Sequence, residues 1–208
     1  MAKLETEKII KGRVAEAIAE EIFKELKFFV MKLGKEHTAN PLDQLKDFVN
    51  VCGGKFELEK LGMEIREISH INVLPDFILV CPNGKVQLLE IKFRYNAELY
   101  DKDLLVFKTY PEAHMLVINT EVSDNIPEIS QKNAQQIEEL KNSHFHIWTR
   151  KNDSENGKIS KEVMNLTEWL KKDFNIEPQL VKDLLLGKYE KLVNYWLGKS
   201  KEIFGEVK

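Results

Sequence analysis

Two carboxylates and a lysine occur within a stretch of sequence that is otherwise apolar. Asp76 comes directly before the apolar run 77–80. Glu90 and Lys92 lie within a second apolar run, 86–93. Carboxylates bind divalent cations, and an ammonium group beside them stabilises negative charge that develops in a reaction. These three residues are therefore the candidates for chemistry if the fold brings them together.

The residues between the two runs are typical of a tight hairpin turn. Pro82 fits the second position of a type I turn, Asn83 the third, and Gly84 the left-handed residue that ends a three-residue loop with a bulge. Counting outward from this loop places Asp76 directly across from Glu90. Side chains so placed have Cβ atoms about 4.5–5.5 Å apart, and like charges there are destabilising unless positive charge lies between them.

The alternation of side chains along a strand puts Lys92 on the same face as Glu90, while Ile91 points into the opposite layer. Burying three charges at this point would cost several kcal/mol without compensating partners. Mg²⁺ would compensate them, because it prefers carboxylate, carbonyl and water oxygens. An ion so held lowers the pKa of bound water, and Lys92 would orient the attacking water or neutralise the developing charge.

A structural ion pair is the alternative interpretation. Lys92 would then pair with Glu90 or Asp76 on a solvent-exposed strand face. Such surface pairs are common and contribute little to stability. The apolar flanks and the register of the hairpin favour the metal site over this alternative.

These residues resemble the PD-(D/E)XK nuclease motif, which Pro75-Asp76 and Glu90-Ile91-Lys92 match. The upstream segment Lys11-Gly12-Arg13-Val14-Ala15-Glu16 resembles the first helix of the archaeal Holliday junction resolvase branch of that superfamily. The resemblance covers roughly residues 8 to 120. It implies an α/β core with a mixed sheet flanked by helices, and enzymes that cleave DNA, less often RNA, using Mg²⁺ or Mn²⁺.

The resemblance also implies a role for each matching residue. The implied catalytic residues are Asp76, Glu90, Lys92 and Glu16. The implied metal ligands are Asp76, Glu90, Glu16 and the main-chain carbonyl of Ile91. On a helical wheel Glu16 lies at the border of the apolar stripe, where a carboxylate can flank a sheet.

Cationic and aromatic residues after the second run are candidates for nucleic-acid binding, because they could grip phosphates or stack on bases. They are Arg94, Tyr95, Lys102 and Lys108. The alternative is a solvated helix face with Tyr100 and Tyr110 in the core.

The elements that must position these residues follow from the spacing of apolar side chains. The predicted helices are residues 5–32, 41–51, 100–110 and 128–142. The predicted strands are residues 63–68, 77–80, 86–93, 113–119 and 145–149. This order predicts an α/β sheet covered on both faces and, with the resemblance, a restriction-endonuclease-like core over residues 1–150.

A polar linker, 151–158, precedes a C-terminal helical extension over residues 158–208. Within it Ser160 is a possible helix cap, Pro178 a helix start, and Gly187 and Gly198 helix stops.

The composition is that of a soluble globular protein. The 208 residues are 43% hydrophobic and 31% charged, with only 10 Gly and 6 Pro, which excludes a disordered or fibrous chain. The formal net charge is −3, so an anionic substrate must be held by a local patch or by metal ions. Cys52 and Cys81 fit neither a zinc site nor a disulfide framework. No apolar run approaches the roughly 20 residues that span a bilayer, and we expect a cytoplasmic protein, or one in the host cytoplasm if its source is viral.

The sequence thus predicts a Mg²⁺- or Mn²⁺-dependent endonuclease acting on duplex, branched or junction DNA, with RNA left open as a substrate. The alternative is a catalytically inactive nuclease-fold protein that binds nucleic acid or acts as a scaffold, which the acidic balance favours. A homodimer is expected from the two-fold symmetry of a junction and the apolar residues of the C-terminal helices.

Overall fold

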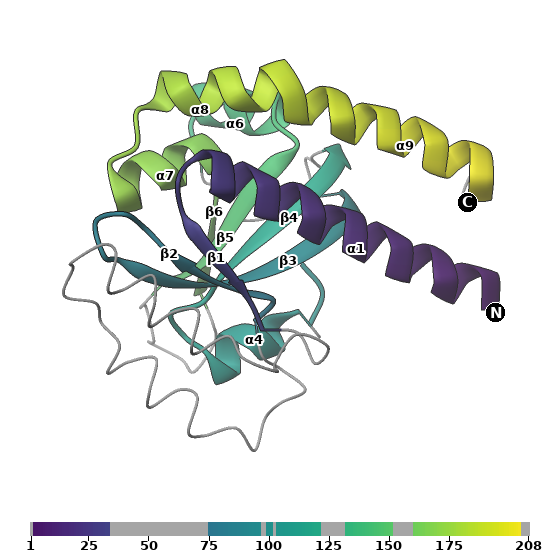
Figure 1. Cartoon of the computed structure of the whole chain (residues 1–208), viewed down its shortest axis with the longest axis horizontal. Coiled ribbons are helices and arrows are strands. Elements are labelled where there is room, and N and C mark those ends of the chain that lie inside the picture. Colours follow the sequence, from purple (N-terminus) through teal and green to yellow (C-terminus); the bar gives the residue numbers. More distant parts are fainter. Residues whose placement is uncertain are drawn as a thin grey trace.

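The computed structural model describes residues 2–33, 75–96, 99–101, 103–121, 132–151 and 160–204. Within these ranges six strands form one sheet in the order β1-β2-β3-β4-β5-β6, flanked by helices (Figure 1). The predicted α/β class and mixed sheet are therefore confirmed. The helix predicted at 41–51 and the strand predicted at 63–68 lie outside the described residues.

The strands are β1 Phe29–Lys32, β2 Phe77–Val80, β3 Val86–Asn96, β4 His114–Glu121, β5 Phe145–Lys151 and β6 Ser160–Asn165. The helices are α1 Ala2–Glu25, α4 Leu104–Thr109, α6 Ala134–Lys141, α7 Leu166–Phe174, α8 Pro178–Leu184, the π-helix η2 Leu185–Tyr189 and α9 Glu190–Phe204. None of these helices combines the length and apolarity needed to cross a bilayer.

The sheet is antiparallel except at its centre. β3 and β4 run parallel and are joined through α4, as a parallel pair requires a crossover connection. All other neighbouring strands are antiparallel. The central strands are apolar at nearly every position because helices cover both faces of the sheet, and Met115 to Ile118 are fully buried.

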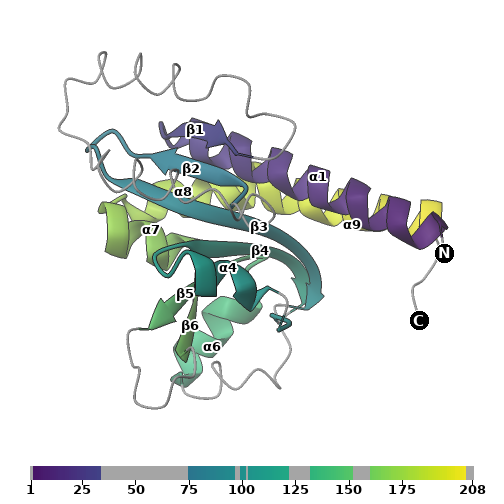
Figure 2. The same ribbon diagram turned by 90° about the horizontal axis from the view of Figure 1, so that it is seen from below.

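Two helical layers enclose the sheet (Figure 2). On one face α1, α7, α8, η2 and α9 pack on Leu89 and Ile91 of β3, in a core centred on Phe23 and Trp169. On the other face α4 packs over Leu88 and α6 packs farther along the sheet. Each residue of β3 therefore belongs to one layer or the other according to its position in the alternation.

The N-terminal helix ends earlier than the sequence predicts. α1 ends at Glu25, Lys27 adopts a left-handed φ of 67°, and the chain then forms β1 instead of continuing to residue 32. Phe29 has helical spacing from the preceding apolar residues, but it pairs with Val80 of β2. Tertiary pairing here overrides the helical pattern, because an unpaired β2 edge would leave backbone groups unsatisfied.

The C-terminal segment is not helical throughout. Ser160, expected as a helix cap, opens β6, which pairs with β5. α7 begins six residues later behind Asn165, whose side chain accepts a hydrogen bond from the Glu168 amide at 2.7 Å. Pro178 begins α8 as predicted.

Neither predicted C-terminal stop ends a helix. Gly187 lies within η2 and Gly198 within α9. The helix continues because Leu185, Tyr189 and Val193 form a buried stripe, and this burial outweighs the cost of about 1 kcal/mol for a glycine in a helix. These residues belong to the same core as α1 and the sheet.

Candidate functional site

The hairpin between β2 and β3 has the predicted register. Phe77 pairs with Leu89 and Val80 with Val86, and with Cys81 opposite Lys85 this leaves a loop of three residues, 82–84. The Cys81 amide donates to the Lys85 carbonyl at 2.8 Å, and the Gly84 amide donates to the Cys81 carbonyl at 2.8 Å. Gly84 has a φ of 86°, the left-handed conformation expected of it. A local turn therefore fixes the position of every residue in the two strands.

Asp76 lies one position beyond β2, directly across from Glu90 in this register. Cys81 and Lys85 form a hydrogen-bonded pair, and bonded and non-bonded pairs alternate along an antiparallel ladder. Asp76 and Glu90 therefore occupy a non-hydrogen-bonded position, where facing residues come closest, with Cα atoms about 4.5 Å apart. The two acids face each other as the sequence predicted.

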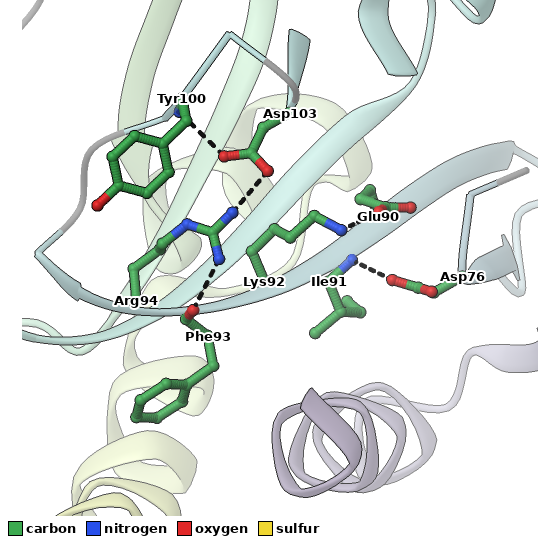
Figure 3. Close-up of polar contacts among 8 residues, drawn as sticks. All are labelled: Asp76, Glu90, Ile91, Lys92, Phe93, Arg94, Tyr100 and Asp103. Carbon is green, nitrogen blue, oxygen red and sulfur yellow. Dashed lines mark hydrogen bonds and ion pairs between the residues drawn. The ribbon is translucent and has the colours of Figure 1, made fainter. Parts of the chain in front are cut away.

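Continued outward by one more position, the register would set Pro75 opposite Ile91. Proline has no amide proton, so Pro75 cannot donate to the Ile91 carbonyl. The Ile91 amide donates instead to Asp76 Oδ2 at 2.7 Å (Figure 3). In a strand the amide and carbonyl of one residue at a bonded position face the same neighbour. By this alternation the Ile91 carbonyl is expected to point toward the same side of β3 as its amide, the side on which Asp76 lies.

Glu90 and Lys92 form a buried ion pair on the face of β3 that α4 covers. The side chains lie on the same side of the strand, and Lys92 Nζ contacts Glu90 Oε1. Glu90 is only 6% exposed, and its Oε2 is buried with no hydrogen-bond partner of good geometry among the described residues, although the Asp76 amide is close enough to favour the ionised carboxylate. The ion pair of the alternative interpretation is therefore present, but not on a solvent-exposed face. A buried carboxylate oxygen without a partner is costly and suited to a cation.

The electrostatic environment opposes ionisation of both acids. Burial, and then the nearby charge of Glu90, raise the pKa of Asp76 to about 7, against the Ile91 amide and Lys92. Burial also raises the pKa of Glu90, although Lys92 opposes this shift. Burial alone would lower the pKa of Lys92, but Glu90, Asp76 and Asp103 together raise it. Lys92 therefore remains a cation at neutral pH.

Asp103 is a buried acid beside the site that the sequence analysis did not select. It is the N-cap residue of α4 and is 3% exposed. Its Oδ1 accepts a hydrogen bond from Arg94 Nη2 at 2.5 Å, and its Oδ2 accepts one from the Tyr100 amide at 2.9 Å. An acid directly before an apolar helical run is a recognisable N-cap signal, but nothing in the sequence predicts the pairing with Arg94.

Glu16 lies near this group without joining it. The neighbours of Glu16 on α1, Ala15 and Ile18, pack in the core on the opposite face of the sheet from Glu90. The Glu16 carboxylate pairs with Arg13 at 3.1 Å, yet it is close enough to contribute to the raised pKa of Asp76. No group of three or more Asp, Glu, His or Cys side chains that could hold a metal occurs in the described part of the chain.

The predicted nucleic-acid-binding residues are placed differently from one another. Arg94 is engaged with Asp103, whereas Lys108 is exposed on α4. Lys102 and the side chain of Tyr95 lie outside the described residues. Of the two tyrosines that the alternative put in the core, Tyr110 is buried and Tyr100 is 50% exposed.

No protein-family model, curated protein or solved structure matches this chain. The geometry of the site is therefore the basis for a functional argument. That geometry brings together Asp76, Glu90, the main chain of Ile91 and Lys92.

Proposed function

We propose that this chain is a metal-dependent endonuclease that hydrolyses phosphodiester bonds of DNA, including branched or junction DNA. Its fold would be the restriction-endonuclease-like fold of the PD-(D/E)XK superfamily. The observation that carries the proposal is the pair of facing acids, Asp76 and Glu90, with Lys92 on the same buried face of β3. Burying charges in a mostly apolar hairpin is costly, and apolar replacements of buried ion pairs are often neutral or stabilising, so the retained charges support a role beyond stability.

The residues at the site fit Mg²⁺ or Mn²⁺. Two carboxylates, from Asp76 and Glu90, and the main-chain carbonyl of Ile91 would hold the ion, and all are the oxygen donors that these ions prefer. The unpartnered Oε2 of buried Glu90 supports this assignment. Mg²⁺ commonly uses only one or two protein carboxylates, so a cluster of three acidic side chains is not required. The bound ion would supply an activated water and stabilise charge on the phosphate.

Lys92 acts as a cation in this proposal and not as a general base. Its pKa is raised by Glu90, so its ammonium group stays protonated at neutral pH. A fixed positive charge in a partly buried position stabilises the negative charge that develops on the phosphate. Glu90 positions this ammonium group through their ion pair.

A cleavage assay tests the proposal. Purified protein is incubated with Mg²⁺ or Mn²⁺ and labelled duplex, junction, flap and single-stranded DNA. We expect Asp76→Asn, Glu90→Gln and Lys92→Met to lower kcat by at least about 100-fold, since removal of one group that stabilises charge costs roughly that much. Lys171→Ala removes an exposed cation from α7, on the opposite face of the sheet from Glu90, and is the control. If the wild-type protein cuts none of the four DNAs with either metal, the proposal is wrong.

A non-catalytic nucleic-acid-binding or scaffold protein is the second candidate. Its support is the closed ion pair of Lys92 with Glu90 and the net charge of −3. Calorimetric titration with Mn²⁺ separates the two candidates. An enzyme binds Mn²⁺ and loses this binding in Asp76→Asn, whereas a scaffold binds no Mn²⁺ at this position.

We also propose a homodimer. Exposed large apolar side chains occur along the C-terminal helices, at Leu180, Leu186, Leu192 and Tyr195. Such side chains in the same region are a feature of surfaces that associate. A monomer mass by light scattering at working concentration would contradict this proposal.

A further inference from the structure

Tyr100 is a large aromatic residue that the fold leaves half exposed beside the candidate active site. Tyr100 precedes α4 and is 50% exposed, whereas Tyr110, the C-cap residue of α4, is buried in the core. Tyr100 lies over the same face of β3 as Lys92 and Arg94 (Figure 3). Its exposed ring therefore borders the face of β3 that carries Lys92.

The ring is held in place by two charged residues beneath it. The Arg94 guanidinium lies 5.3 Å from the ring centroid, in cation–π contact. The Asp103 carboxylate binds that guanidinium and also accepts a hydrogen bond from the Tyr100 amide at 2.9 Å. The Asp103 amide donates a hydrogen bond to the Tyr100 carbonyl at 2.8 Å. A second Arg94 nitrogen donates to the Phe93 carbonyl at 3.0 Å. Backbone and ring of Tyr100 are thus both fixed.

The ion pair beneath Tyr100 is expensive for the fold. Asp103 is almost fully buried and Arg94 is largely buried, so both charges lose most of their hydration. Engaged in this way, the Arg94 guanidinium is not free to bind a phosphate bidentately. Its contacts are those of a support for the aromatic ring.

Arg94, which supports the ring, lies on the same face of β3 as the candidate catalytic residues. Glu90, Lys92 and Arg94 occupy every second position of the strand, so their side chains point to one face. Four residues of a strand span about 13 Å. A base stacked on Tyr100 would therefore belong to a nucleotide within a few positions of the phosphate that contacts a metal ion at Glu90.

We propose that Tyr100, supported by Arg94 and Asp103, is a stacking platform for an unpaired nucleobase of the substrate. This inference rests on the proposed function and specifies its substrate class as nucleic acid with unpaired bases next to the cleaved bond. In a duplex the base faces are covered by their neighbours, whereas single strands, flaps and branch points offer a face to an aromatic side chain. Stacking tolerates any base, so the platform selects structure and not sequence.

Binding measurements with fluorescent DNA test this inference. The probes are a forked DNA with one single-stranded arm and a fully paired duplex of the same length, in Ca²⁺ so that binding is measured without cleavage. We expect Tyr100→Ala to weaken binding of the fork by about 5- to 150-fold and to leave duplex binding unchanged. Tyr100→Phe keeps the ring and should bind the fork like the wild type. Leu105→Ala, which removes a comparably exposed apolar side chain from α4, is the matched control.

A spectroscopic signal distinguishes stacking from a merely structural role. With 2-aminopurine in the single-stranded arm, stacking on Tyr100 changes its fluorescence on binding. The change should be lost in Tyr100→Ala and kept in Tyr100→Phe. Equal affinity of wild type and Tyr100→Ala for the fork, an equal loss for fork and duplex, or no binding by the wild type overturns the inference.

The cleavage assay separates failure of the inference from failure of the proposed function. If the wild type cuts forked DNA and Tyr100→Ala cuts it with the same KM, the nuclease proposal stands and the platform is wrong. If no DNA is cut but the fork binds through Tyr100, the platform stands and the catalytic proposal is wrong.

Discussion

Asp76 is the residue through which pH should act most directly on the candidate site. Its pKa is raised to about 7 in the folded chain, against an ordinary value near 4. Between these two values the folded state binds more protons than the unfolded state, so the contribution of Asp76 to stability decreases as pH rises. Metal binding requires the ionised carboxylate, so a divalent cation should reverse this effect above pH 7.

Replacement of Asp76 by Asn tests this linkage. Asn retains an acceptor for the Ile91 amide but cannot ionise. Without divalent cations we expect Asp76→Asn to gain stability relative to the wild type between pH 5 and pH 8, by about 1–3 kcal/mol, since one unit of pKa shift corresponds to about 1.4 kcal/mol. Urea denaturation in EDTA at the two pH values measures the difference. A difference between variant and wild type that does not change with pH would contradict the expectation.

Addition of Mn²⁺ at pH 8 completes this test. The ion should raise the urea midpoint of the wild-type protein, because a ligand that binds only the folded state stabilises it. It should leave the midpoint of Asp76→Asn unchanged. Equal stabilisation of both proteins would place the metal elsewhere.

Among the elements of the fold, the β2–β3 hairpin is the one on which the site depends. Its register comes from a three-residue loop in which Gly84 has a φ of 86°. We expect Gly84→Ala to destabilise the chain by about 1–2 kcal/mol, since that is the cost of a left-handed conformation for a residue with a Cβ. Gly84→Asn should cost less, because Asn tolerates this conformation. Urea midpoints should fall in the order Gly, Asn, Ala, and an equal midpoint for Asn and Ala would contradict the reason given.

The local character of this turn explains why the facing acids could be predicted from the sequence. Five consecutive residues determine the register, and strand alternation then places Asp76, Glu90 and Lys92 without knowledge of the rest of the chain. β1 and β6 could not be found in this way. β1 is defined by pairing with a strand that is distant along the chain. β6 has the sequence SKEVMN, which is mostly polar and lacks the apolar alternation that predicts a strand.

The ion pair of Arg94 with Asp103 beneath Tyr100 could not be predicted from the sequence either, because it joins two elements whose ends the sequence does not define. The predicted strand ended at Phe93, whereas β3 continues to Asn96 and so carries Arg94 on the same face as Glu90 and Lys92. The predicted helix began at Tyr100, whereas α4 begins at Leu104 with Asp103 as its N-cap. β3 continues because it pairs with β4 as far as Asn96, opposite Glu121, and the ion pair of Arg94 with Asp103 is likewise a contact between two elements.

At the scale of the whole molecule, one core supports the site from behind. α1 and the C-terminal helices pack together against the sheet on the face opposite Glu90, and Trp169 and Phe174 of α7 belong to the same cluster as Phe23 of α1. The N-terminal end of α1 and the C-terminal end of α9 both project beyond the sheet on the same side of the molecule (Figures 1 and 2). The C-terminal helices thus help to fix the strand that carries the candidate residues.

Two histidines, fully buried His146 and largely buried His114, lie on opposite faces of the sheet and should make the fold sensitive to acid. His146 is fully buried, its ring hydrogen-bonded to Asn119 and to the Leu140 carbonyl, and burial lowers its pKa to about 4. Burial against Trp169 similarly lowers the pKa of His114 to about 4. The unfolded chain binds protons at these residues near pH 6.5 and the folded chain does not, so stability is lost as pH falls from about 6.5 to about 4.

His146→Gln provides the test of this acid sensitivity. The variant should be less stable than the wild type at pH 7.5 by about 1–3 kcal/mol, because the hydrogen bonds between β4, β5 and α6 are impaired. Its further loss of stability between pH 7.5 and pH 5 should be smaller than that of the wild type, since one proton-binding group of the unfolded state is gone. Urea denaturation at both pH values measures the two slopes. If the slopes are equal, protonation of His146 on unfolding does not contribute to acid denaturation, and the loss would have to arise at His114 or among the carboxylates.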